Sequence, residues 1–146
     1  MSKLTLADLS KTMADIDFAI LSTRTEGGDI AGRPMSNNGE VEYDGDSFFF
    51  ALDTTRTVAD IGRDPKVALS FTGSKGLLGK PPIFITIEGR GELIRDKAEF
   101  QAHWNKDLEI WFAAGADTPG LVLIKVEATR IHYWDGEDEG EIPVHR

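Results

Sequence analysis

The chain has 146 residues and a mass of 16.1 kDa, with 40% hydrophobic and 28% charged residues. This size and balance predict one folded domain spanning residues 1–146 and exclude disordered, collagenous and multi-domain proteins. Cysteine is absent, which excludes disulfides, thiolate metal sites and cysteine nucleophiles together. No apolar run approaches the roughly 18 residues of a membrane-spanning helix, and an acid interrupts the start where a signal peptide is apolar. We therefore expect a cytoplasmic protein without a membrane partner.

The charge balance argues against a nucleic-acid partner. The chain carries 16 basic and 25 acidic residues, for a net charge of −9, and the basic residues are spread along the sequence. Such a protein repels nucleic acids and anionic membrane surfaces. Residues 135–146 hold five of the acids and one arginine, so we expect a solvated acidic tail there.

The first elements along the chain are predicted to be a short helix and a hairpin. Thr5 and the acid three residues later form a capping box for a helix within residues 1–14. A run of strand formers follows at 18–25 and stops at a Glu-Gly-Gly-Asp turn. The return strand, 30–42, contains Pro34, which cannot donate to a sheet ladder and therefore predicts an edge or a bulge.

The middle of the chain predicts strands on either side of one helix. Residues 47–52 form a strand that is apolar enough to be buried on both faces. A helix capped by Thr54 or Thr55 follows it, and Pro65 ends this helix because the residue before a proline avoids the helical region. The next strand is expected at 67–71.

The last third predicts a long curved strand, a helix and a final pair of strands. Residues 83–94 form the long strand, with Gly89 and Gly91 as bend or bulge points. Asp96 caps the helix, and the final strands are 121–127 and 130–134. Because the helices are too short for parallel crossovers, we predict a mainly antiparallel β-barrel with flanking helices.

The most informative local pattern is the strand-to-helix connection Thr54-Thr55-Arg56-Thr57. Backbone N–H groups at a helix start, hydroxyl groups and a guanidinium together suit a phosphate monoester. A plainer interpretation is that one threonine only caps the helix and that Arg56 is an exposed first-turn residue. A second cation, Arg33, lies on the return strand, where a bulge would aim it inwards and a regular strand would leave it solvated.

Several short pieces in a fixed order resemble one known family. They are Gly32-Arg33-Pro34-Met35, Phe48-Phe49-Phe50-Ala51, Thr54-Thr55-Arg56, Asp64-Pro65-Lys66-Val67-Ala68-Leu69, Ile87-Glu88-Gly89-Arg90-Gly91-Glu92-Leu93, Trp111-Phe112 and Tyr133-Trp134-Asp135. This set resembles the FMN-binding split-barrel proteins related to pyridoxamine 5'-phosphate oxidase, within them the general stress protein 26 branch. The resemblance covers about residues 15–135.

The resemblance implies an antiparallel Greek-key split barrel that forms a two-fold homodimer, with FMN, or FAD, in a groove between the subunits. It places Arg33 and Arg56 at the phosphate or at the ribityl and ring oxygens, and it brings Trp111 from the partner subunit. The full set of implied cofactor contacts is Arg33, Met35, Ser36, Phe50, Ala51, Thr54, Thr55, Arg56, Thr57 and Trp111.

Two departures from the family pattern bear on activity. The oxidases commonly follow the arginine of the helix start with a lysine, whereas Thr57 follows Arg56 here. They also close the substrate pocket with a basic C-terminal segment, whereas this chain ends in an acidic one. We therefore expect no pyridoxamine phosphate oxidase activity.

Three functions remain open at this stage. The first is an oxidoreductase in which bound FMN takes electrons from a donor such as NADH or NADPH, so that no catalytic side chain is needed. The second is a flavin-buffering stress protein without turnover, and the third is the same fold with haem or a deazaflavin. The three histidines share no metal-ligand spacing, so no metal site is predicted.

Overall fold

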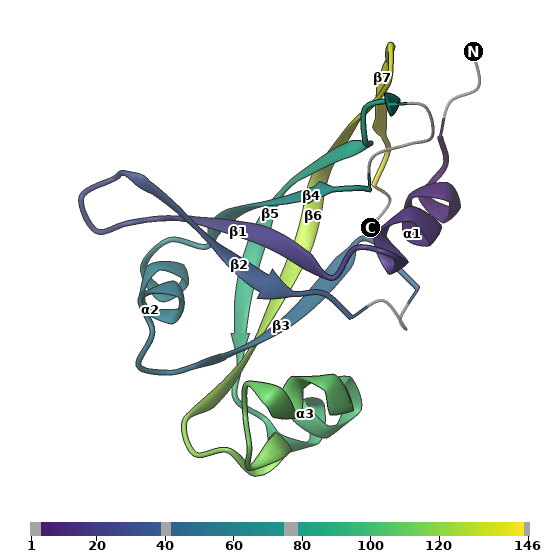
Figure 1. Cartoon of the computed structure of the whole chain (residues 1–146). Helices are drawn as coiled ribbons and strands as arrows, with labels where there is room; N and C mark the ends of the chain where they lie inside the picture. The colour runs from purple at the N-terminus through teal and green to yellow at the C-terminus, as the bar shows by residue number, and fades with distance from the viewer. Residues whose placement is uncertain (1–3, 39–41, 75–78, 145–146) are drawn as a thin grey trace.

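The computed structural model describes residues 4–38, 42–74 and 79–144, and within them it contains one antiparallel seven-stranded sheet and three α-helices (Figure 1). The strands are β1 (Phe18–Arg24), β2 (Ile30–Ser36), β3 (Asp46–Leu52), β4 (Lys66–Thr72), β5 (Phe84–Ile94), β6 (Leu121–Asp135) and β7 (Asp138–Ile142). The helices are α1 (Leu6–Ala14), α2 (Arg56–Arg63) and α3 (Lys97–His103), with the short 3-10 turns η2 (Lys106–Ile110) and η3 (Gly115–Asp117). Parts of the expected first helix, return strand and tail, at 1–3, 39–41 and 145–146, lie outside the described residues.

The sheet follows the order β2-β1-β4-β5-β6-β3, and β7 pairs with the second half of β6. Among the described residues β2 and β3 are not paired with each other, so the sheet curls without closing and these two strands form its edges. The predicted antiparallel split barrel is confirmed, including the placement of Pro34 in an edge strand. Figure 1 shows α2 beside one end of the curled sheet and α3 at another.

Side-chain caps explain where the three helices begin. In α1 the Thr5 hydroxyl accepts from the Asp8 backbone N–H at 3.2 Å, and the Asp8 carboxylate accepts from the Thr5 N–H at 2.8 Å. These bonds to Thr5 lower the pKa of the exposed Asp8 carboxyl. Thr55 caps α2 and Asp96 caps α3 in the same way. The sequence predictions of these starts are confirmed.

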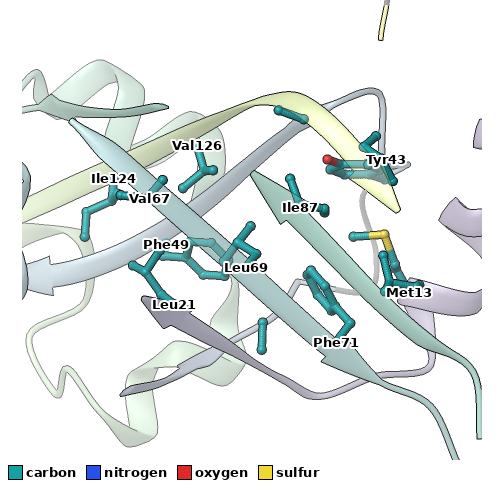
Figure 2. Packing of buried hydrophobic residues seen from close by; sticks show 14 of the residues in the cluster. Met13, Leu21, Tyr43, Phe49, Val67, Leu69, Phe71, Ile87, Ile124 and Val126 are labelled. Atoms are coloured by element: carbon teal, nitrogen blue, oxygen red, sulfur yellow. The ribbon is translucent and has the colours of Figure 1, made fainter. Parts of the chain in front are cut away.

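Period-two alternation along the strands builds the core. On β1, for example, Ala19, Leu21 and Thr23 point inwards and are at most 1% exposed. Figure 2 shows side chains of several strands in one apolar cluster, among them Leu21, Phe49, Leu69 and Ile87, and Met13 of α1 belongs to the same cluster. A smaller apolar cluster lies between α3 and the strands β3 and β6. The two clusters hold the edge strands β2 and β3 in fixed positions.

The final strand prediction needs a correction, because β6 is one strand of 15 residues and not two. Glu88 pairs with Arg130 while the next residue, Gly89, pairs with Ala128, so the register shifts at this point. The extra residue, Thr129, forms a β-bulge that bends the strand without ending it. The bend expected at Gly89 is therefore a bulge in its partner.

The expectation of a solvated tail is wrong for the segment that forms β7. This strand pairs with β6, and its last residue, Ile142, is 5% exposed and joins the core. Arg130 binds the Glu141 carboxylate and also lies 3.3 Å from Glu88. The hydrogen bond from Arg130 lowers the pKa of Glu141. Pairing with an existing strand thus overrides the weak strand propensity of this acidic sequence.

Candidate functional site

An apolar pocket occupies the split between the two sheet edges. Its walls come from β1, β2 and β3 and from the segment between α3 and β6, and it encloses about 240 Å³. The lining residues are Phe18, Pro34, Met35, Ser36, Phe49, Phe50, Leu108, Trp111 and Phe112. Because the two edge strands do not pair here, their inner side chains are left to line a slot and not a closed core.

Aromatic contacts behind this pocket fix its walls. The ring of Trp104 makes edge-to-face contacts with Phe50 at 5.0 Å and with Phe112 at 6.1 Å, and the Phe100 ring makes a third such contact, with Phe50 at 6.0 Å. Among the residues that the structure describes, Trp111 makes no such ring contact, and it is 62% exposed. The site therefore has a rigid floor and one large, exposed aromatic ring in its lining.

A second pocket, of about 360 Å³, is cationic. It lies between α2 and the β1–β2 hairpin, and it is lined by three arginines, Arg33 of β2 with Arg56 and Arg63 of α2. Two acids, Asp60 and Glu26, also line it, so the charged residues of its wall leave a net charge of +1. This is a local positive site in a chain whose net charge is −9.

A buried carboxylate connects two of the three arginines. Asp60 is 5% exposed, and its Oδ2 accepts from the Thr23 hydroxyl at 2.8 Å and lies 3.6 Å from Arg33 Nη2. Its Oδ1 accepts from Arg63 Nη2 at 3.0 Å. Arg33 Nη1 also donates to the Thr23 hydroxyl at 2.7 Å. Two guanidinium groups from different elements are thus tied to one carboxylate.

The two pockets border the same strand, β2. Arg33 of the cationic pocket and Met35 of the apolar pocket are alternate residues of this strand, so they face the same side and are about 7 Å apart along it. The apolar slot and the cationic pocket therefore follow one another along one edge strand. A ligand with an aromatic ring system and an anionic end suits this arrangement.

The residues predicted from the sequence fall into two groups. Met35, Ser36, Phe50 and Trp111 line the apolar pocket, and Arg33 and Arg56 line the cationic one. Within its own chain Trp111 lines the apolar pocket, and its approach from the partner subunit stays a prediction.

The other predicted residues line neither of these pockets. They are Ala51, Thr54, Thr55 and Thr57. Ala51 and Thr57 are buried, at 8% and 7% exposure. The Thr55 hydroxyl donates to the Leu52 carbonyl at 2.8 Å and accepts from the Val58 N–H, which is the capping role of the plainer interpretation.

Of the lining residues of the cationic pocket, the sequence analysis predicted only Arg33 and Arg56, and it missed the ion-paired residues Asp60 and Arg63 among others. Both lie on α2 at four and seven residues after Arg56, so they share one face of the helix with it. That helical spacing is the sequence signal that predicts their position once Arg56 is taken as a site residue.

Comparisons with solved structures agree with this architecture. Comparison with the curated proteins gives no match. Among solved structures, a protein from Clostridium acetobutylicum related to general stress protein 26 of Bacillus subtilis is 18% identical, with a TM-score of 0.78 over 95% of this chain and 94% of that one. A general stress FMN/FAD binding protein from Xanthomonas citri is 22% identical, with a TM-score of 0.73 over 91% and 89% of the two chains.

A haem-binding protein from Mycobacterium smegmatis is also similar in structure, with 16% identity and a TM-score of 0.74 over 97% of this chain and 60% of that one. At these identities the three structures show a common fold. The model of the family described as pyridoxamine 5'-phosphate oxidase like matches residues 5–144, which is nearly the whole chain. No helix among the described residues combines the length and apolar character needed to cross a bilayer. Because the family model covers nearly all of the chain, the chain belongs to the pyridoxamine 5'-phosphate oxidase-like family of split-barrel proteins.

Proposed function

We propose that this protein binds a flavin nucleotide, FMN or FAD, in the split between β2 and β3, and that it acts as a flavin-dependent oxidoreductase. The observation that carries the proposal is the junction on β2, where Arg33 of the cationic pocket and Met35 of the apolar slot share one face. The similarity to a general stress FMN/FAD binding protein supports the same ligand class.

The residues present fit the two chemically different ends of FMN. Its phosphate carries about −1.5 to −2 charge at neutral pH, and Arg33, Arg56 and Arg63 offer guanidinium groups that bind phosphate oxygens in pairs. Its ring system is flat and largely apolar, which suits a slot floored by Phe49 and Phe50. The arginines bind and orient the phosphate, and the aromatic walls exclude water from the ring.

A bound flavin supplies hydride and electron transfer itself, so the chain's role is binding, orientation and exclusion of water. Turnover is tested by adding NADH or NADPH to the flavin-loaded protein and following the loss of nicotinamide absorbance with time. We expect oxidation that continues over many turnovers when an acceptor is present. Flavin binding without nicotinamide oxidation would favour a buffering protein over an enzyme.

Ligand identity is tested by an absorbance spectrum of the purified protein and a fluorescence titration of the protein with added FMN and FAD. We expect flavin absorbance bands or saturable quenching of flavin fluorescence at micromolar protein concentrations. A haem absorbance band, or folded protein that leaves flavin fluorescence unchanged, would contradict the proposal. In that case haem and a deazaflavin become the ligands to test.

The proposal includes a homodimer, which the outer face of the sheet supports. Phe18 and Ile20 of β1 and Phe84 of β5 point away from the core and are between 43% and 53% exposed. Apolar side chains grouped on the outside of a sheet are typical of surfaces that another protein covers. Phe18 also lines the apolar slot, so a second copy on this face would reach the flavin site.

Phe84→Asp is expected to shift the protein from dimer to monomer, because each subunit would then have to bury a charge in an apolar interface. Mass in solution, measured by light scattering over a concentration series, reports the change. Ala7→Asp is the control, since it adds the same charge at an exposed position of α1. A Phe84→Asp protein that keeps the dimer mass would exclude this face as the interface.

A further inference from the structure

We propose that Asp60 is a positioning residue of the cationic pocket and that Arg63 is the third cation of this anion site. The inference rests on the proposed flavin function and deepens it, because it names what fixes the phosphate-binding arginines. The feature that carries it is the bridge from Arg33 through the Asp60 carboxylate to Arg63, which joins β2 to α2.

The Asp60 carboxylate is buried, so its contacts must compensate for the loss of hydration. The side chain is 7% exposed, and removing a carboxylate from water is costly unless hydrogen bonds and opposite charges compensate. Here hydrogen bonds from Thr23 and Arg63 and an ion pair with Arg33 at 3.6 Å supply that compensation. The charge is therefore satisfied within the wall of the pocket and does not require a ligand.

The bridge also solves a problem of repulsion between the arginines. Two guanidinium groups that face one small pocket repel each other and would turn towards solvent. Ordering these side chains when an anion binds would then cost conformational entropy. With one carboxylate between them, Arg33 and Arg63 are held in place before the anion arrives. Arg33 is fixed further by its bond to the Thr23 hydroxyl, which Asp60 itself orients.

The spacing on α2 gives Arg63 access to the same ligand as Arg56. Residues at i, i+4 and i+7 share a helix face, and Arg56, Asp60 and Arg63 all line the pocket. Arg63 is 40% exposed, and among the described residues its guanidinium contacts only Asp60, which occupies one Nη2 donor. Its remaining donors are available to phosphate oxygens.

The direction in which Asp60→Asn changes FMN affinity distinguishes a positioning role of Asp60 from a purely electrostatic one. Removing a negative charge beside an anion site would strengthen phosphate binding by Coulomb's law alone. A positioning role gives the opposite result, because the asparagine amide cannot hold two guanidinium groups. We expect Asp60→Asn to weaken FMN binding about tenfold, the equivalent of one charge-assisted hydrogen bond.

Riboflavin lacks the phosphate, so comparing its affinity with that of FMN distinguishes a loss of phosphate binding from a general structural defect. We expect Asp60→Asn to leave riboflavin affinity unchanged, so that the ratio of the FMN and riboflavin dissociation constants changes about tenfold. Tighter or unchanged FMN binding, or equal losses for both ligands, would overturn the inference. Asp64→Asn is the charge-matched control, since Asp64 pairs with Arg24 at 3.8 Å and does not line the pocket.

A second variant keeps the test decisive if Asp60→Asn does not fold. Arg63→Met removes a half-exposed side chain and leaves Asp60 its hydrogen bond from Thr23 and its ion pair with Arg33, so we expect the fold to be retained. We expect it to weaken FMN binding at least threefold with riboflavin affinity unchanged. Unchanged FMN affinity in Arg63→Met would remove Arg63 from the site and overturn the inference.

Inorganic phosphate separates a failure of this inference from a failure of the proposed function. We expect phosphate to raise the melting temperature of the wild-type protein above that in chloride at equal ionic strength, and Asp60→Asn or Arg63→Met to lose this rise. If the wild type binds neither FMN nor FAD, the proposed function fails. The phosphate result then decides alone whether Asp60 and Arg63 form an anion site. A rise of equal size in wild type and both variants would overturn the inference.

Discussion

Arg56→Ala is expected to weaken FMN binding by about 1.5–3 kcal/mol, which corresponds to a factor of about ten to a hundred in Kd. Arg56 is exposed in the first turn of α2 and lines the cationic pocket. Within the described residues its side chain forms no hydrogen bond or ion pair, so its donors are available to a phosphate. A fluorescence titration of flavin with wild type and variant measures the loss.

Arg56 is a cleaner probe than Arg33 for this purpose. Arg33 is bonded to Thr23 and lies beside the buried Asp60, so its removal leaves a buried charge with fewer partners and lowers stability. For Arg56→Ala we expect the free energy of unfolding to change by less than about 0.5 kcal/mol. Thermal unfolding of both proteins without ligand checks this.

Arg90→Ala is the matched control, because Arg90 is an exposed arginine of β5 outside the cationic pocket. Both variants change the net charge by the same amount, so an effect of net charge alone would appear in both. A direct contact weakens it only in Arg56→Ala. Unchanged affinity in Arg56→Ala would remove this residue from the flavin site.

The parts of the fold that the sequence predicts well are those set by local chemistry. The Thr5 capping box, the Thr55 and Asp96 caps and the helix stop at Pro65 each depend on a few neighbouring residues. The hydrogen bonds that satisfy the first N–H groups of a helix come from within one turn. These features are therefore visible in the sequence without knowledge of the rest of the chain.

The parts that the sequence did not predict depend on partners that are distant in the chain. The strand β7 exists because β6 offers it a free edge and Arg130 compensates its acids, and neither is visible in the sequence of residues 138–142. Likewise, the continuity of β6 through Thr129 depends on the opposing Gly89, which is 40 residues away in the chain. Local propensity gives weak guidance in such places.

The candidate site was predicted only in part, because some of its residues are marked by local sequence and others depend on distant partners. Arg33, beside the proline of a strand, and Arg56, at a helix start, stand out in the sequence, so a local pattern finds them. Asp60 has no motif of its own, and its role follows only from the approach of β1 and β2 to α2. A buried acid that holds two arginines from different elements is a property of the assembled fold and not of any local segment.

Gly89→Ala is expected to lower the free energy of unfolding by about 3 kcal/mol, at the upper end of the range for overpacking. A methyl group at this position would lie 2.5 Å from the Glu127 carbonyl oxygen and 3.2 Å from its carbonyl carbon. These are backbone atoms of β6, so they cannot rotate away as a side chain does. The bulge between β5 and β6 would have to open, and equilibrium denaturation by urea measures the cost.

Gly62→Ala provides the control with the same chemical change and the opposite expected sign. Gly62 lies in α2, and an added methyl group there would meet the Leu93 side chain at 3.7 Å, an ordinary contact distance. Alanine is favoured over glycine inside a helix by about 0.5–1 kcal/mol, so this variant should be slightly more stable than wild type. Equal stabilities for Gly89→Ala and wild type would contradict the close approach of β6 to Gly89. Such a result would also contradict the register shift that forms the bulge, since the two strands would then have room for a side chain at the shift.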